Sequence, residues 1–165
     1  MAKFQHILVA TDFSACAEEA LRQAVDLAQG LQGKITLLHV FESPFPYPDA
    51  PSLSAYPQLY RSLQDFKREE EKKLQSIAGT VGTAIGIRPL FKEGSPSLEI
   101  VKAARELKAD LIVVGTHGRA GMSRFLMGSV AQKVSQIASC PVLIVREKSD
   151  EASEEAAGEA TKEPG

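Results

Sequence analysis

Short runs of consecutive hydrophobic residues recur along the chain, and polar or glycine residues follow each of them. Such runs are typical of strands that are buried on both faces of a sheet. The third run is interrupted by Gly86 and Pro89, which favours a position near the edge of the sheet. The pattern predicts five strands, in "FQHILVATD" (4–12), "KITLLHV" (34–40), "AIGIRPLFKEG" (84–94), "DLIVVG" (110–115) and "CPVLIV" (140–145).

Between these runs, apolar residues recur at the spacing of amphipathic helices. Ser14 is the expected N-cap of the first helix, and Gly30 or Gly33 is its expected stop. A later helix is expected to begin with Ser95 as cap and Pro96 at its first position. The other two helices are predicted over 61–82 and from about Gly128 to Ser139. The predicted core faces are Ala17, Ala20, Leu21, Ala24, Val25 and Ala28; Leu63, Phe66, Leu74, Ile77 and Ala78; and Ile100, Val101, Ala104 and Leu107.

This alternation of strands and helices predicts an α/β fold, with right-handed crossovers and a parallel sheet covered by helices on both faces. Ligands of such sheets bind beyond the carboxyl ends of the strands, where the strand order reverses. The end of the first strand, from Ala10 to Ser14, and the end of the fourth strand, from Gly115 onward, carry polar or glycine residues. These two strand ends are therefore the expected site.

Three segments stand out by their composition. Residues 41–60 contain five of the nine prolines, so this segment is expected to be a loop, functional or mobile. The run "KREEEKK" (67–73) is interpreted as a solvated helix face, with a partner site as the alternative. From Glu147 onward the chain has seven acidic residues, two lysines and no aromatic residue, which predicts disorder. The expected organisation is one domain over 1–146, including the proline-rich loop, and an acidic disordered tail over 147–165.

Composition narrows the class of protein. Hydrophobic residues make up 44% and charged residues 24%, as in an ordinary globular domain. No apolar run approaches the ~20 residues of a membrane span, and the start lacks the pattern of a signal peptide. A cytoplasmic protein without membrane contact is expected. The basic residues are scattered, which disfavours nucleic-acid binding.

The cysteines and histidines offer no metal or redox motif. Cys16 and Cys140 lack CxxC spacing and are interpreted as buried thiols that act as small hydrophobic residues. The three histidines lack metal-ligand spacing. His39 is interpreted as a core histidine, and His6 is given no functional role. No metal site is predicted.

Four glycines lie within fourteen residues after the fourth strand, in "GTHGRAGMSRFLMG". Their spacing matches neither the GxGxxG dinucleotide fingerprint nor the P-loop. The observed pattern, Gly115-x2-Gly118-x9-Gly128-Ser129, would let the backbone approach a ligand closely and would open a helix whose free N–H groups suit an anion. Arg119, Ser123 and Arg124 would then come within range of phosphates. The alternative is that these glycines only serve tight turns.

These residues carry a resemblance to the universal stress protein family. It covers almost all of residues 1–146 and rests on "HILVATDFS", "LLHV", "GSPSLEIVKAARELKADLIVVGTHGRAG", "GSVAQKV" and "CPVLIV". The glycine pattern resembles the G-x2-G-x9-G-[ST] motif of the ATP-binding branch of that family. The resemblance implies a Rossmann-like, adenine nucleotide alpha hydrolase-like fold with a five-stranded parallel sheet in the order 3-2-1-4-5.

The resemblance also implies a site and an assembly. ATP, with Mg²⁺, would lie across the first and fourth strand ends, with Asp12 near the ribose or adenine and the Val40 backbone at the adenine. Asp12 has an alternative role as an N-cap, and His117 is open between a phosphate contact and an exposed loop position. A homodimer through the strand at Pro141–Val145 is expected. The predicted nucleotide-binding residues are Ala10, Thr11, Asp12, Val40, Gly115, Thr116, His117, Gly118, Arg119, Gly128, Ser129 and Val130.

Three functions remain open from the sequence. The first is an ATP-binding regulatory switch in the stress response, with slow or no hydrolysis and an unknown protein partner. The second is a weak ATPase with a chaperone-like or signalling cycle; no catalytic residue is evident, because no base has a fixed position. The third is an interaction module with a vestigial pocket. The sequence does not choose between ATP, ADP, AMP and a cyclic nucleotide.

Overall fold

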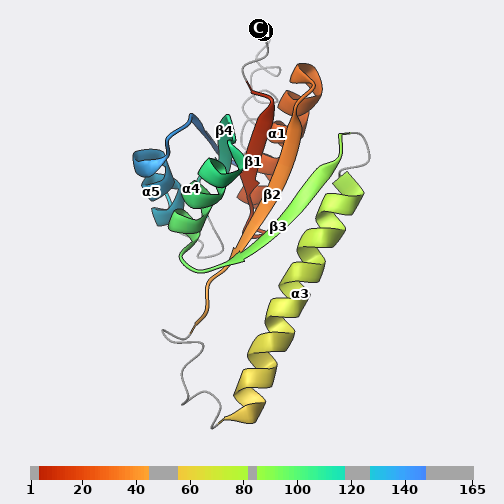
Figure 1. Ribbon diagram of the computed structural model, residues 1–165, viewed down its shortest axis with the longest axis vertical. Helices are drawn as coiled ribbons and strands as arrows, with labels where there is room; N and C mark the ends of the chain where they lie inside the picture. Colours follow the sequence, from red (N-terminus) through yellow and green to blue (C-terminus); the bar gives the residue numbers. More distant parts are fainter. Residues whose placement is uncertain (1–3, 45–55, 82–84, 118–126, 148–165) are drawn as a thin grey trace, which may run out of the picture.

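The computed structural model describes residues 4–44, 56–81, 85–117 and 127–147, and these form a parallel five-stranded sheet with helices on both faces (Figure 1). The strand order is β3-β2-β1-β4-β5, which confirms the predicted fold class and topology. The elements are β1 (His6–Ala10), α1 (Ala15–Leu31), β2 (Lys34–Phe41), α3 (Pro57–Val81), β3 (Ile87–Glu93), α4 (Pro96–Leu107), β4 (Leu111–Gly115), α5 (Ser129–Ile137) and β5 (Val142–Val145).

Two hydrophobic clusters hold the helices against the sheet. Ile7 and Val9 of β1 pack with α1 and α3, whereas Leu8, between them, packs with α4 and α5 on the other face. This division follows from the strand geometry, because successive side chains point to opposite faces. Each fully buried large aliphatic side chain contributes about 1.5–3 kcal/mol relative to its exposed form. The continuous hydrophobic runs are therefore explained by a sheet covered on both sides.

Helix α1 begins as predicted but ends differently. The Ser14 hydroxyl accepts a hydrogen bond from the Ala17 N–H at 3.3 Å, so Ser14 is the N-cap. The helix passes through Gly30 and ends at Leu31, and its C-cap residue Gln32 has the left-handed φ of 55°. The expected stop at Gly30 was wrong. Gly33, the other expected stop, directly follows the cap, and its N–H donates to the Ala28 carbonyl at 2.8 Å. A Cβ at Gly33 would also lie 3.0 Å from the Phe4 carbonyl oxygen.

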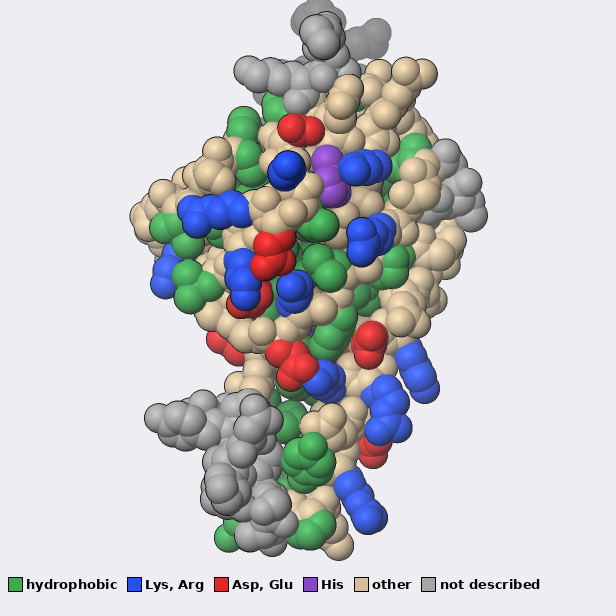
Figure 2. All heavy atoms as spheres, in the orientation of Figure 1, with side chains coloured by type: hydrophobic (Ala, Val, Ile, Leu, Met, Phe, Trp, Pro, Cys, Tyr) green, Lys and Arg blue, Asp and Glu red, His purple; other side chains and the backbone are tan. Residues whose placement is uncertain are grey.

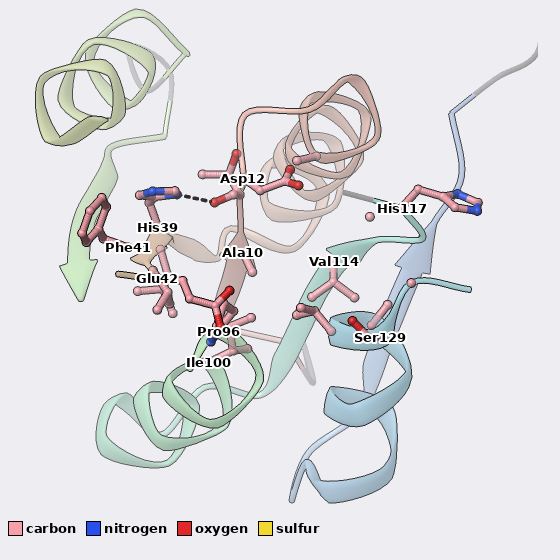
Figure 3. Close-up of a pocket in the computed structure, with 18 of the residues that line it drawn as sticks. Ala10, Asp12, His39, Phe41, Glu42, Pro96, Ile100, Val114, His117 and Ser129 are labelled. Atoms are coloured by element: carbon pink, nitrogen blue, oxygen red, sulfur yellow. Dashed lines mark hydrogen bonds between the residues drawn. The ribbon is translucent and has the colours of Figure 1, made fainter. Parts of the chain in front are cut away.

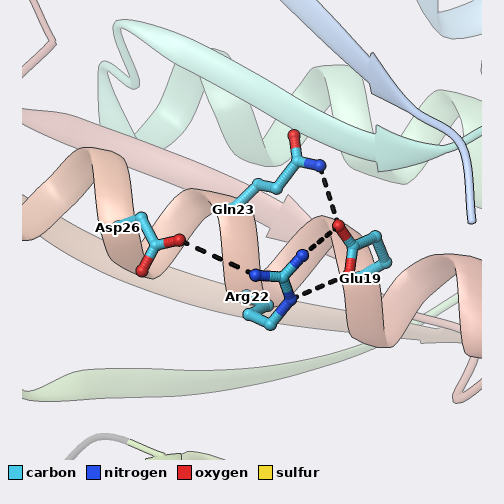
Figure 4. Close-up of polar contacts among 4 residues, drawn as sticks. All are labelled: Glu19, Arg22, Gln23 and Asp26. Atoms are coloured by element: carbon cyan, nitrogen blue, oxygen red, sulfur yellow. Dashed lines mark hydrogen bonds and ion pairs between the residues drawn. The ribbon is translucent and has the colours of Figure 1, made fainter. Parts of the chain in front are cut away.

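The outer face of α1 carries a cluster of charged and amide side chains (Figure 4). Glu19 accepts hydrogen bonds from Arg22 and from the Gln23 amide, and Asp26 lies 3.9 Å from the same guanidinium. The hydrogen bond that Arg22 donates to Glu19 is the main reason that the pKa of Arg22 is raised above its ordinary value. Exposed pairs three or four residues apart stabilise a helix only slightly. This cluster therefore supports α1 locally.

Helix α3 is longer than the sequence indicated. It begins at Pro57, inside the segment expected to be a loop, and proline is tolerated there because the first helical N–H has no intrahelical acceptor. Its first turns extend past the carboxyl ends of the strands (Figure 1). Residues 45–55 lie outside the described part, so the expected proline-rich loop is untested there. Leu63, Leu74 and Ala78 are buried as predicted, but Phe66 is 49% exposed.

The start of α4, the place of β3 and the burial of the two cysteines agree only in part with the sequence-based expectations. Pro96 stands in the first turn of α4 as predicted, but the Ser95 side chain makes no capping hydrogen bond. Strand β3 lies at an edge of the sheet, in agreement with its Gly86 and Pro89. Cys16 is buried, whereas Cys140 is only partly buried.

The side chains on the surface are mixed in type, and no helix in the described part of the chain is suited to a membrane. Basic and acidic side chains are interspersed on the face drawn in Figure 2, where apolar side chains of α3 are also exposed. Among the described residues, no helix has both the length and the apolar character to span a bilayer.

His6 is a buried structural histidine at the start of β1. Its Nδ1–H donates to the Leu107 carbonyl at 3.1 Å, since a carbonyl only accepts, and its Nε2 then accepts from the Thr36 hydroxyl at 2.9 Å. Burial is the main cause that lowers the pKa of His6 below its ordinary value of 6.5, and the nearby Lys34 charge adds to it. The neutral ring therefore fits this site, and a second ring proton would compete with the Thr36 hydroxyl.

Stability is therefore expected to fall as the pH drops below about 6.5. In the window between the folded pKa and 6.5, the unfolded chain binds the extra His6 proton and the folded chain does not, so stability rises with pH there. Urea unfolding of the natural protein and of His6→Gln between pH 8 and pH 5 measures this effect. The advantage of the natural protein should shrink toward acid pH, and a constant difference would contradict it.

Candidate functional site

A cavity of about 450 Å³ opens at the carboxyl ends of β1, β2 and β4 (Figure 3). This volume lies within the ~300–1,000 Å³ that is typical of small-molecule sites. The cavity lies where the strand order reverses, since β2 and β4 flank β1 on opposite sides although they follow it in sequence. Its lining comes from the ends of these strands, from α4 and from the start of α5, with Phe66 and Glu70 contributed by α3.

The structure brings ten of the twelve predicted site residues around this one cavity. Gly118 and Arg119 lie outside the described residues, as do Ser123 and Arg124, which were expected within range of phosphates. The ten that line the cavity are Ala10, Thr11, Asp12, Val40, Gly115, Thr116, His117, Gly128, Ser129 and Val130.

The turn after β1 forms one wall of the cavity. One Asp12 carboxylate oxygen (Oδ1) accepts hydrogen bonds from the Ser14 N–H at 3.0 Å and from the Ser14 hydroxyl at 2.5 Å. Asp12 is therefore not the N-cap of α1, which was the alternative considered for it, but it orients the residue that is. Phe13 follows with a left-handed φ of 65°, and its N–H donates to the Thr11 hydroxyl at 3.0 Å. Because side chains other than glycine rarely adopt this φ, surrounding contacts must hold the turn.

Gly115, at the end of β4, is required by packing. A Cβ at this position would lie 2.9 Å from the Cβ of Cys16 and 3.0 Å from its carbonyl carbon. The first turn of α1 thus rests directly on the β4 backbone. The structure gives Gly115 no positive φ, so a left-handed backbone in a tight turn, which the alternative interpretation of these glycines would favour, is not the reason for its presence. Beyond it, the buried Thr116 hydroxyl lies 2.9 Å from His117 Nδ1.

The opposite wall of the cavity is the first turn of α5. Gly128 is its N-cap residue and offers no side-chain cap, and its N–H donates to the Thr116 carbonyl at 2.7 Å. The first hydrogen bond into the helix runs from the Gln132 N–H to the Gly128 carbonyl at 3.0 Å. The N–H groups of Ser129, Val130 and Ala131 therefore have no intrahelical acceptor and carry the positive end of the helix dipole.

The side of the cavity beyond β2 is largely apolar and includes residues that the sequence reasoning missed. Phe41, Pro96 and Ile100 line it together with Val40, and the exposed Glu42 stands beside them. Figure 3 shows Phe41 and His39 at one end and Ser129 and His117 at the other. The cavity thus has an apolar end suited to a flat ring and a polar end suited to an anion.

His39 and Glu70 form a buried pair behind the β1 turn, and their interaction was not foreseen. His39 is 4% exposed, as expected for a core histidine, but it also lines the cavity. Glu70 is 7% exposed, so the interpretation of 67–73 as a solvated face was wrong at this residue. A signal was available, because Glu70 follows Leu63 by seven residues and precedes Leu74 by four, which places it on the buried stripe.

Among the residues that the structure describes, no group of three or more histidine, cysteine or carboxylate side chains could hold a metal ion. The polar residues that line the cavity include Asp12 and Thr11 at the end of β1, Thr116 after β4, Glu42 after β2 and Ser129 at the start of α5. A carboxylate at one wall and a helix N-terminus at the other give the cavity opposite electrostatic ends.

A parallel sheet in the order 3-2-1-4-5, with a cavity at the reversal of strand order, defines a Rossmann-like α/β protein with a small-molecule site. The model of the universal stress protein family matches residues 3–146. The chain therefore belongs to the universal stress protein family.

Individual relatives agree with this assignment. A universal stress protein of Methanocaldococcus jannaschii is 34% identical over 148 residues, which cover 90% of this chain and 85% of the relative. The structure of universal stress protein UspA from Lactobacillus plantarum superimposes with a TM-score of 0.77 at 28% identity, and covers 88% of this chain and 100% of that one. A universal stress protein crystallised in complex with cAMP has a TM-score of 0.56 at 25% identity, with 88% and 98% covered.

Proposed function

We propose that the cavity binds ATP, together with Mg²⁺, and that the protein is a nucleotide-dependent regulatory switch of the stress response. The observation that carries this proposal is the geometry of one continuous cavity. It joins an apolar end at Val40, Phe41 and Ile100 to the uncapped N-terminus of α5. An adenine base suits the first end, and phosphates suit the second, because free backbone N–H groups and the helix dipole favour anions.

The G-x2-G-x9-G-[ST] spacing supports the same assignment, because Gly115, Gly128 and Ser129 all line the cavity. The related protein crystallised with cAMP is a family member that accepts an adenine nucleotide. In this proposal the ribose lies near Asp12, and the phosphates are held by the N–H groups of Ser129 and Val130 and by Gly118 and Arg119. Ala10 and Thr11 form the floor between the two ends.

Hydrolysis is proposed to be slow or absent. In-line attack on a phosphate needs a positioned base or an oriented water. Asp12, the carboxylate at the β1 end of the cavity, already accepts two hydrogen bonds from Ser14. Its role is thereby better explained as orientation of the turn than as proton abstraction. A weak ATPase is the second candidate function. It differs from the proposed switch only in that the bound ATP is hydrolysed at a measurable rate.

The assembly that we propose is a homodimer through β5. This strand lies at the end of the sheet order, and its Val142, Leu143 and Ile144 are only partly buried by the described residues. An apolar strand at an open edge is prone to pair with another chain. Pairing with its own copy would cover this edge and would leave the cavity, on the other side of β4, open to ligand.

The test is direct. Freshly purified protein should release ATP when it is denatured, and nucleotide-stripped protein should bind Mg-ATP in calorimetry and melt at a higher temperature when it is added. GTP, which presents a different base edge to the apolar end, is the control and should bind more weakly. Bound ADP with continuing phosphate release would instead favour the ATPase. No uptake of ATP, ADP, AMP or cAMP at millimolar concentration would overturn the proposal and favour an interaction module.

A further inference from the structure

The buried pair of His39 and Glu70 lies between α3 and the turn that forms one wall of the cavity. His39 Nδ1 lies 2.8 Å from the Thr11 carbonyl oxygen, and Nε2 lies 3.0 Å from Glu70 Oε2. The first of these contacts is drawn in Figure 3. Both side chains are almost fully buried, so these hydrogen bonds lie largely out of contact with solvent.

The chemistry of the two acceptors fixes where protons must be. A carbonyl oxygen only accepts, so Nδ1 must carry a proton in order to bond to Thr11. With the ring proton on Nδ1, the Nε2 of a neutral imidazole is an acceptor, and an ionised Glu70 carboxylate is an acceptor too. A second proton is therefore required between Nε2 and the Glu70 carboxyl. The pair therefore holds one shared proton. The Thr11 carbonyl fixes the proton on Nδ1, and Glu70 fixes the orientation of the ring from the Nε2 side.

The ring in turn supports the strained turn. Phe13, with its left-handed φ, stacks on the imidazole with ring centroids 4.4 Å apart and an interplanar angle of 29°. Lys73, one turn after Glu70 on α3, places its Nζ 4.8 Å from the centroid of the same phenyl ring. Helix α3 is thus linked to the segment from Thr11 to Phe13 in two ways. Glu70 is hydrogen-bonded to His39, which bonds to the Thr11 carbonyl, and the Lys73 ammonium lies over the Phe13 ring.

We propose that His39 and Glu70 are positioning residues that hold the Thr11–Phe13 turn in its ligand-binding conformation and couple the position of α3 to nucleotide affinity. This inference rests on the proposed function for its ligand, but the state of the turn is measurable without one. By linkage, anything that displaces α3 weakens nucleotide binding, and nucleotide binding holds α3 in place to the same extent. In the proposed switch, His39 and Glu70 would link the cavity to α3, the helix that extends past the sheet.

The experiment compares Glu70→Met, Glu70→Gln and the control Glu69→Met, whose residue is exposed on the same helix. Mg-ATP affinity is measured by calorimetry well below each melting temperature. Glu70→Met should weaken binding about tenfold, an effect of the size of one lost hydrogen bond to a charged group. Glu70→Gln should stay within about threefold, because its amide can donate to Nε2 while Nδ1–H still bonds to Thr11. Glu69→Met should bind normally.

A second readout uses the ligand-free protein. The backbone amide NMR resonances of Asp12 and Phe13 should move in Glu70→Met and remain in Glu70→Gln and Glu69→Met. Should Glu70→Met fail to fold, His39→Gln tests the same link, since its amide still reaches Glu70 but no longer reaches the Thr11 carbonyl; it should weaken binding about tenfold as well.

The outcomes separate this inference from the proposed function. Unchanged affinity and unchanged Asp12 and Phe13 resonances in Glu70→Met would overturn the positioning role. An equal loss of affinity in Glu70→Gln and Glu70→Met would also overturn it, because charge and not orientation would then matter. If the natural protein binds no nucleotide while the resonances move as expected, the pair positions the turn and only the proposed ligand is wrong.

Discussion

Gly115→Ala is expected to lower the melting temperature, whereas Gly30→Ala is expected to raise it. A Cβ at Gly115 would lie 2.9 Å from the Cys16 Cβ and 3.1 Å from its carbonyl oxygen, so α1 or β4 must move. Forcing an extra carbon into such a packed contact costs about 1–3 kcal/mol. For a domain of this size, each kcal/mol corresponds to roughly 2–4 °C in melting temperature.

Gly30 is the matched control because it lies inside α1 and a Cβ there has nothing within 4 Å. Replacing a helical glycine by alanine in open space should stabilise by about 0.5–1 kcal/mol. Thermal melting of the two variants beside the natural protein measures both effects. Nucleotide affinity should fall in Gly115→Ala alone, since α1 and the β4 end flank the cavity. Equal melting temperatures for the two variants would show that the α1–β4 contact yields easily.

The fold could be predicted from the sequence because the hydrophobic pattern is strong and local. Continuous apolar runs identify strands covered on both faces, and the helices between them leave few connections for a parallel sheet. The helix boundaries were less accurate, because a residue other than glycine takes the left-handed conformation and because a proline that indicated a loop begins a helix. Gln32 ends α1 in the left-handed region, and Pro57 begins α3 inside a proline-rich segment.

The candidate site could be predicted only where its residues follow strand ends or form a spaced motif. Gly115 and Gly128 were found by their spacing, but the reason for each is a contact distant in sequence, with Cys16 and with the Thr116 carbonyl. Glu70 was obscured by the charged residues around it, although its spacing from Leu74 marked a buried position. The partnership of His39 and Glu70 depends on how α3 packs against β2, which no local pattern specifies.

Gly128→Asp is expected to abolish most nucleotide binding while leaving the fold intact. Gly128 has the extended φ and ψ of −62° and 150° that an N-cap aspartate adopts, so the new carboxylate would accept hydrogen bonds from the first N–H groups of α5. It would thus occupy the groups proposed to bind phosphate and place a negative charge beside them. Losing charge-assisted hydrogen bonds worth about 1.5–3 kcal/mol corresponds to roughly 10- to 100-fold weaker binding.

The control for this variant is Gly128→Ala, which adds the same Cβ without the charge. That Cβ would lie 3.0 Å from the Thr116 carbonyl oxygen, a tight contact that both variants share. Calorimetry with Mg-ATP and thermal melting should therefore show a small common change in stability and a large loss of affinity only with aspartate. Equal affinity losses would assign the effect to the Thr116 contact. Unchanged affinity in Gly128→Asp would mean that no phosphate lies at the α5 N-terminus, and the anion would have to be held elsewhere in the cavity.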